Sequence, residues 1–112
     1  AIGTEYETLA CEYLIRHGYQ ILCRNFRCRQ GEIDIIARDR DYLVFIEVKY
    51  RHDEHEGDPA EAVDARKQAR ILRTARYYMT RYHISEDTPC RFDVVAVLGS
   101  NVRLIRDAFW CG

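Results

Sequence analysis

Apolar side chains recur at three- and four-residue steps in two parts of the chain, a pattern that predicts two amphipathic helices. The first spans residues 4–17, with Thr4 as its N-cap and Gly18 as its C-terminal stop. The second runs from the N-cap Asp64 to about residue 83. Most basic residues of this second segment lie off its apolar stripe, so one face is predicted to pack and the other to meet solvent.

Runs of β-branched and aromatic residues predict strands elsewhere. They cover residues 19–23, 32–37, 42–50, 92–98 and 102–109. The charged residues 38–41 form the predicted turn of a hairpin, and the apolar run at 92–98 is typical of a strand buried on both faces. The polar, acidic residues 52–61 are predicted to form a loop. The order helix, strands, helix, strands predicts an α/β or mixed α+β domain built on one central sheet.

Length and composition agree with this prediction and indicate a single domain. With 112 residues and a hydrophobic fraction of 47%, the chain is expected to form one domain over residues 1–112 and not to be disordered. Its apolar runs are too short to cross a bilayer and no signal-peptide pattern opens it, so no membrane association is expected. The five cysteines form no CxxC pair, which disfavours a disulfide framework and predicts a cytoplasmic location.

The charge is nearly balanced, −1 from 17 basic and 18 acidic side chains, which excludes a histone-like or polybasic protein. Its distribution is uneven, because six basic residues and no acid lie between Asp64 and Glu86, whereas acids gather in residues 53–64. A basic helix face suits the phosphates of a nucleic acid. The candidate nucleic-acid-binding residues are Arg66, Lys67, Arg70 and Arg73. The alternative is a solvated helix face with no partner.

Two of the predicted strands carry acids among apolar neighbours. Side chains alternate along a strand, so Glu32 and Asp34 share one face of the first. Glu47 and Lys49 likewise share one face of the next. If these faces coincide, two or three carboxylates and an ammonium converge, an arrangement that suits Mg²⁺ or Mn²⁺. The alternative is an ordinary cross-strand pair of Glu47 with Lys49, and Asp34 solvated at a sheet edge.

Lysine is rare in this chain. Of the 17 basic residues 15 are Arg, and the only lysines are Lys49 and Lys67. A compact ammonium whose pKa can be tuned differs chemically from a guanidinium, so a lysine at position 49 is not an arbitrary cation. Beside a metal ion, Lys49 is the candidate group for orienting a water molecule or stabilising a developing anion.

The spacing of these residues resembles a known signature. Asp34, followed after a short hairpin by Glu47-Val48-Lys49, is similar to the active-site pattern of the PD-(D/E)xK nuclease superfamily. More closely, the chain resembles the YraN family of bacterial endonuclease-like proteins, which are related to archaeal Holliday junction resolvases. The resemblance covers nearly the whole chain and includes Gly31-Glu32-Ile33-Asp34-Ile35-Ile36-Ala37, Val44-Phe45-Ile46-Glu47-Val48-Lys49 and Arg91-Phe92-Asp93-Val94-Val95.

The resemblance implies a restriction-endonuclease-like fold, a mixed central sheet flanked by helices. It makes Asp34 and Glu47 metal ligands, Lys49 the catalytic lysine and Glu7 an additional acid of the site. The implied activity is Mg²⁺-dependent endonucleolytic hydrolysis of DNA, with branched DNA as the kind of substrate the family suggests. The alternative is a catalytically inactive nucleic-acid-binding module that keeps the nuclease-like fold. One small domain has a small footprint, so a homodimer is the hypothesis for cleavage of two strands.

Three acids keep other interpretations. Glu7 also fits a capping box with Thr4, in which it satisfies the start of the helix. Glu32 is either a carboxylate that supports the metal ligands or a solvated strand residue. Asp93 enters a buried strand, and its pairing with Arg91 or capping of a turn is favoured over a site role.

Two tyrosines depart from the family pattern. Tyr6 precedes Glu7 where many relatives carry Gly, and Tyr50 follows Lys49 where a small polar residue is frequent. Neither removes a ligand, and both are expected to narrow the mouth of the site.

Overall fold

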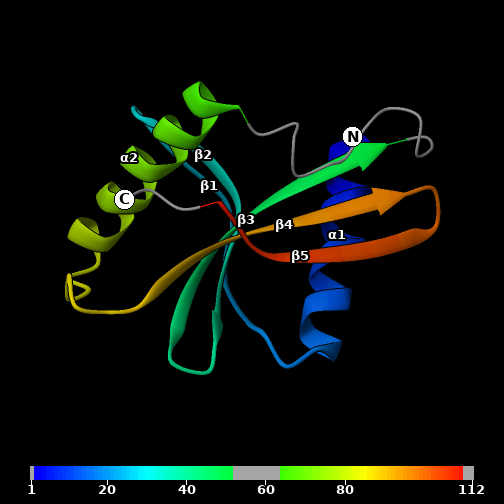
Figure 1. The fold of residues 1–112 in the computed structure, drawn as a ribbon, viewed down its shortest axis with the longest axis horizontal. Coiled ribbons are helices and arrows are strands. Elements are labelled where there is room, and N and C mark those ends of the chain that lie inside the picture. The colour runs from blue at the N-terminus through cyan, green and yellow to red at the C-terminus, as the bar shows by residue number, and fades with distance from the viewer. Residues whose placement is uncertain (1, 52–63, 110–112) are drawn as a thin grey trace.

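The computed structural model describes residues 2–51 and 64–109, and the loop predicted at 52–61 lies outside the described residues. Two helices and five strands follow one another along the chain (Figure 1). They are α1 (Ile2–Arg16), β1 (Gln20–Cys28), β2 (Gly31–Asp39), β3 (Tyr42–Arg51), α2 (Ala65–Arg81), β4 (Cys90–Leu98) and β5 (Asn101–Phe109).

The five strands form one mixed sheet in the order β1-β2-β3-β4-β5. The β3–β4 pair is parallel and the other three pairs are antiparallel. The chain passes from β3 to its parallel neighbour through α2, because parallel strands need a crossover. The predicted α/β class, a mixed central sheet flanked by helices, is confirmed, and it is consistent with a restriction-endonuclease-like fold.

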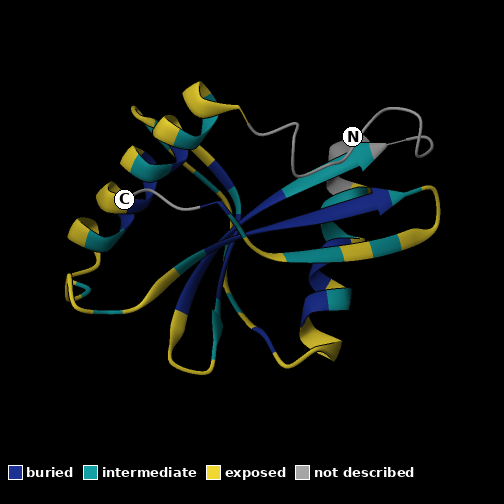
Figure 2. Ribbon diagram, in the orientation of Figure 1, coloured by how far each residue is buried: buried dark blue, intermediate teal, exposed yellow. Residues whose placement is uncertain are grey.

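The helices cover opposite faces of the sheet (Figure 1). On one face Ile71 and Tyr78 of α2 pack against Ile36 and Phe45. On the other face α1 packs through a second apolar cluster of its own, which contains Leu14. The middle of the sheet is buried from both sides, as Figure 2 shows, and the run Phe92 to Val97 of β4 is buried throughout, as its apolar sequence predicts.

Several predicted boundaries are confirmed and two are corrected. Asp64 caps α2, because its side chain accepts a hydrogen bond from the Lys67 amide at 2.8 Å, and Gly18 follows α1 at a φ of +89°. Thr4 as an N-cap is wrong, since α1 begins at Ile2 and residue 4 lies within its first turn. The first strand is longer than predicted, because its basic end, up to Cys28, pairs with β2 at an edge of the sheet.

Neither helix in the described ranges is both long and apolar enough to cross a membrane. The cysteines of those ranges, Cys11, Cys23, Cys28 and Cys90, are free thiols.

Candidate active site

The β2–β3 hairpin opens beside two acids. The antiparallel register of these strands ends at the pair Ile35↔Ile46. Asp34 and Glu47 are the next residues outward on the two strands. By strand alternation Glu47 belongs to the face that α2 covers, two residues beyond Phe45. Asp34 lies between Ile33, which packs on that face, and Ile35, which packs on the other. Because β3 continues along β4 to its end, the strands part at the two acids.

Asp34 is partly buried, and its Oδ2 accepts a hydrogen bond from the Val48 amide at 2.8 Å. This bond satisfies a β3 amide where the ladder with β2 has ended. The pKa of Asp34 is nevertheless raised to about 7, first by burial and then by the negative charges of Glu47 and Glu7. The Val48 amide and the Lys67 ammonium only partly oppose that rise. A carboxyl held in this way gains from any added positive charge.

Both lysines of the chain lie on the neighbouring carboxylate. Glu47 is 8% exposed, and its Oε1 is 3.4 Å from the Lys49 Nζ and 2.5 Å from the Lys67 Nζ. Lys49 comes from the same strand face two residues on, and Lys67 reaches the site from the first turn of α2. We call Asp34, Glu47, Lys49 and Lys67 the acid site.

The two ammonium groups respond differently to this arrangement. Burial, followed by the neighbouring Lys67 ammonium, lowers the pKa of Lys49, although Glu47 opposes the change. Burial also acts to lower the pKa of Lys67, but its hydrogen bond to the Glu47 carboxylate and the negative charges of Glu47 and Asp34 outweigh burial, so the net pKa is raised. Lys49 is therefore the lysine that is pushed toward its neutral form.

Glu7, on α1, lies near enough to Asp34 for its charge to act on that carboxyl. It is half-buried, and its charge contributes to the raised pKa of Asp34. The capping-box alternative is wrong, because it requires Thr4 at the N-cap and the helix begins two residues earlier. The neighbouring Tyr6 stacks on Tyr50, with ring centroids 4.0 Å apart, and so joins α1 to the end of β3 next to the site.

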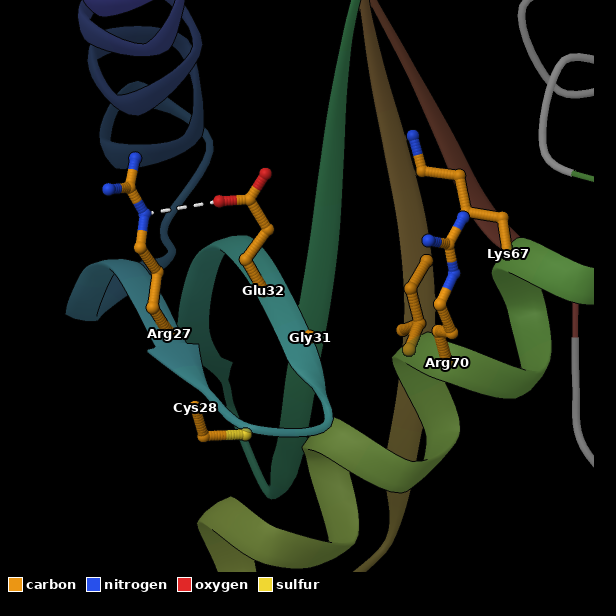
Figure 3. A pocket seen from close by; sticks show the side chains of 7 residues that line it. Arg27, Cys28, Gly31, Glu32, Lys67 and Arg70 are labelled. Atoms are coloured by element: carbon orange, nitrogen blue, oxygen red, sulfur yellow. Dashed lines mark hydrogen bonds and ion pairs between the residues drawn. The ribbon is translucent and has the colours of Figure 1, made fainter.

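A pocket of about 410 Å³ lies between α2 and the end of the β1–β2 hairpin. Figure 3 shows Lys67 and Arg70 extending from α2 on one side, with Arg27 and Glu32 on the hairpin opposite. Glu32 is exposed and pairs with Arg27 at 3.1 Å, which fits the solvated interpretation of that residue.

The four predicted nucleic-acid-binding residues do not share one environment. Arg66, Arg70 and Arg73 are exposed on α2, as a nucleic-acid face requires. Lys67 is half-buried and pairs with Glu47 instead of pointing only to solvent. The structure therefore places Lys67 in the acid site as well as on the wall of the pocket.

The donor set fits one class of metal ion. In residues 2–51 and 64–109 no group of three or more His, Cys, Asp or Glu side chains is close enough to hold a metal. This argues against a closed Zn²⁺ cage among those residues. Two carboxylates remain, Asp34 and Glu47, and Mg²⁺ commonly takes only one or two protein carboxylates and completes its shell with water and phosphate oxygens. Asp34 is also the carboxyl whose raised pKa a cation would offset.

A second cluster of buried charge lies toward the opposite end of β2. Arg91 donates to both carboxylate oxygens of Asp93 and to Asp39, at 2.9 Å each. Asp93, which is fully buried, also accepts from the Tyr19 hydroxyl at 3.0 Å and the Asp107 amide at 2.9 Å. We call Arg91, Asp93, Asp39 and Tyr19 the Arg91 cluster. The predicted pairing of Asp93 with Arg91 is confirmed.

The contact between Lys67 and Glu47 is the feature of the site that sequence reasoning missed. The signal that could have found it is compositional, because Lys67 is the other lysine in a chain that otherwise uses Arg. The charge pattern of the helix grouped Lys67 with the arginines of its exposed face, so its role at Glu47 was not predicted.

Comparison with known proteins identifies relatives along nearly the whole chain. Residues 6–97 match the model of the uncharacterised protein family UPF0102. A UPF0102 protein of Lachnoclostridium phytofermentans is 55% identical over 107 residues, which cover 96% of this chain and 91% of the relative. UPF0102 proteins of Nitrosococcus oceani and Clostridium botulinum are 43% and 48% identical, over 96% of this chain and 90% and 93% of their own lengths.

Proposed function

The chain belongs to the uncharacterised protein family UPF0102, and we propose that this member is a Mg²⁺-dependent endonuclease of the PD-(D/E)xK type that hydrolyses DNA. One observation carries the proposal. Asp34 and Glu47 lie side by side where two strands part, with the pKa of Asp34 raised to about 7 and the Lys49 ammonium beside them. Perturbed ionisable groups gathered in this way are typical of catalytic sites.

The residues present divide the chemistry between them. Asp34 and Glu47 would hold Mg²⁺, which supplies positive charge against phosphate oxygens and makes a water molecule more acidic. The Lys49 Nζ would donate a hydrogen bond to the attacking water or to the oxygen on which negative charge develops. Its lowered pKa makes proton transfer at Nζ easier near neutral pH than for an exposed lysine. Glu7 adds negative charge beside Asp34, which favours cation binding.

The basic surface would position the substrate. Arg66, Arg70 and Arg73 are exposed along α2, on the helix that brings Lys67 to the acid site. Arginines on such a surface bind backbone phosphates without reading sequence, and this suits an enzyme that recognises the shape of DNA, such as a branch. A homodimer would bring two such sites to two strands, and light scattering at working concentration tests it.

Cleavage assays test the proposed activity directly. The protein is incubated with Mg²⁺ or Mn²⁺ and duplex, single-stranded or four-way-junction DNA. We expect cleavage to fall by about 10³-fold in Asp34→Ala and Lys49→Ala, because each removes a group that acts on the reacting phosphate. The matched control is Glu12→Ala, an exposed acid of α1, which should cleave like the wild type. Binding of every DNA without cleavage in either metal would overturn the nuclease proposal.

One observation favours the second candidate, a nucleic-acid-binding module without activity. Both lysines already pair with Glu47, so protein cations neutralise that carboxylate. In this case calorimetry would detect no Mn²⁺ binding that depends on Glu47, while DNA binding would persist and weaken on substitution of Arg70 or Arg73.

A further inference from the structure

Glu47 has an excess of positive partners. The two ammonium groups of Lys49 and Lys67 both lie within ion-pair distance of one oxygen, Glu47 Oε1. In the described ranges no ion pair joins Asp34, 13 residues earlier, to a cation. A divalent cation shared by Asp34 and Glu47 would meet two ammonium groups at once, and like charges at such distances repel strongly in a partly buried site. At least one lysine must move when the cation binds.

The surroundings of the two lysines indicate which one moves. The Lys49 side chain is 17% exposed and rises from a central strand beside Glu47. The Lys67 side chain is 31% exposed and is the more accessible of the two lysines. Its backbone amide is fixed by Asp64 at 2.8 Å, so the side chain can move without disturbing the start of α2.

The pocket between α2 and the hairpin offers Lys67 a second position. Lys67 already lines this pocket, with Arg70 on the same helix and Arg27 on the opposite wall (Figure 3). The pair of Arg27 with Glu32 is exposed and therefore weak, so Arg27 can turn toward another anion. Three cations around one pocket of about 410 Å³ suit a phosphate group.

The close approach of the hairpin to α2 is a built feature. Gly31, at the start of β2, has a φ of +151°, and a Cβ at this position would lie 3.0 Å from the Thr74 Oγ1 of α2. A side chain here would be strained at this φ and would force Thr74 to shift by a few tenths of an ångström, so glycine suits the close approach. Arg27 of this hairpin lines the pocket together with Lys67 and Arg70.

We propose that Lys67 is an exchangeable cation, which neutralises Glu47 in the metal-free protein and, when a divalent cation binds, moves into the pocket to bind a substrate phosphate with Arg27 and Arg70. The proposal rests on the metal site of the proposed function and goes beyond it. Metal and DNA then strengthen each other's binding through one side chain, and by thermodynamic linkage the two effects are equal.

Calorimetry with Mn²⁺ tests the exchange without any activity measurement. Removing the competing ammonium in Lys67→Met should tighten Mn²⁺ binding in the absence of DNA, by about tenfold. The control Arg76→Met removes a charge from the exposed side of the same helix, beside a different cavity, and should leave the Mn²⁺ affinity unchanged. Equal affinities of wild type and Lys67→Met would overturn the proposal.

A second measurement separates exchange from a general effect of charge. The affinity of a short phosphorothioate duplex, chosen to resist hydrolysis, is measured by anisotropy in EDTA and in Mn²⁺. The wild type should bind more tightly in Mn²⁺, and this gain should shrink by about tenfold in Lys67→Met but persist in Arg76→Met. A gain that Lys67→Met retains in full would contradict the exchange.

Different results would contradict the metal site and the exchange of Lys67. If Glu47→Gln binds Mn²⁺ as tightly as the wild type, the metal site itself is wrong and the exchange with it. If Mn²⁺ binding depends on Glu47 but is indifferent to Lys67, only the exchange is wrong.

Discussion

The acid site and the Arg91 cluster both contain buried acidic and basic side chains, but their surroundings favour opposite protonation behaviour. In the Arg91 cluster, hydrogen bonds from Arg91 to Asp93 raise the pKa of the guanidinium and so favour its charged form. In the acid site, burial raises the pKa of Asp34 to about 7 and lowers the pKa of Lys49, so both groups are pushed toward neutral forms. Buried charge therefore stabilises the Arg91 cluster, whereas the acid site would be stabilised by binding a further cation.

Geometry explains the difference. Every polar side-chain atom of Asp93 has a partner supplied by its own and neighbouring strands, and the Tyr19 hydroxyl completes the set, with a pKa raised to about 12 by burial and by Asp93. Within residues 2–51 and 64–109 Asp34 accepts from a single backbone amide, and both nearby lysines lie on Glu47. A satisfied network is rigid and structural, whereas an unbalanced one can respond to a ligand.

The largest expected effect is the loss of the Arg91 cluster. Asp93→Asn leaves the Arg91 guanidinium partly buried with a weakened partner, so the free energy of unfolding should fall by about 3–5 kcal/mol. Urea denaturation measures the change, and Glu12→Gln, on the exposed side of α1, is the control with no expected effect. A fall of less than about 1 kcal/mol would contradict the structural role of the cluster.

A smaller effect of the opposite sign is expected in the acid site. Asp34→Asn removes a charge that burial and Glu47 disfavour, while its side-chain oxygen can still accept from the Val48 amide. The free energy of unfolding at pH 8 should rise by about 2 kcal/mol. Differential scanning calorimetry measures the change.

The pH dependence of that gain has a definite sign. The raised pKa of Asp34 means that its contribution to stability is fully present below pH 4 and is lost as the pH rises through about 7. The advantage of Asp34→Asn should therefore grow between pH 4 and 8. An advantage that stays constant over this range would show that Asp34 is not the perturbed group.

The smallest effect is stabilisation by metal. At a tenfold excess over its Kd, Mn²⁺ should stabilise the wild type by about 1.4 kcal/mol, which is seen as a rise in Tm. Glu47→Gln should lose this rise, because it removes a metal ligand. Tyr19→Phe, in the Arg91 cluster, should keep the rise although its starting Tm is lower. The same loss in both variants would remove the distinction between the two regions.

Local sequence rules account for most of the fold. Periodicity located both helices and Asp64 caps α2 as predicted, because these features depend on neighbours within about one turn, whereas the predicted cap Thr4 lies inside α1. The strand that was predicted too short shows the limit. Its basic end looks unlike a strand but is held by pairing with β2, a contact that the local sequence does not encode.

The candidate site divides in the same way. Strand alternation predicted that the acids of the two strands would meet Lys49 if the polar faces coincided. Glu47 does lie beside Lys49, whereas Glu32 is exposed and pairs with Arg27. The contact of Lys67 with Glu47 depends on how α2, in the connection between the parallel strands β3 and β4, packs on the sheet. The hydrophobic periodicity of the sequence does not predict that packing. The partners of Arg91 on other strands were hidden for the same reason, whereas Asp93, two residues away, was predicted.

Both lysines of the chain contact the same carboxylate, and this has a practical consequence for chemical labelling. Arg supplies every other basic side chain, so an amine-directed reagent meets only two side-chain amines in the whole sequence, and both contact Glu47. Lys49 is the more nucleophilic of them near neutral pH, since its pKa is lowered. Mass spectrometry of the two modified lysines would therefore report whether a metal ion or a substrate is bound at the acid site. The method needs no engineered label and no knowledge of the natural substrate.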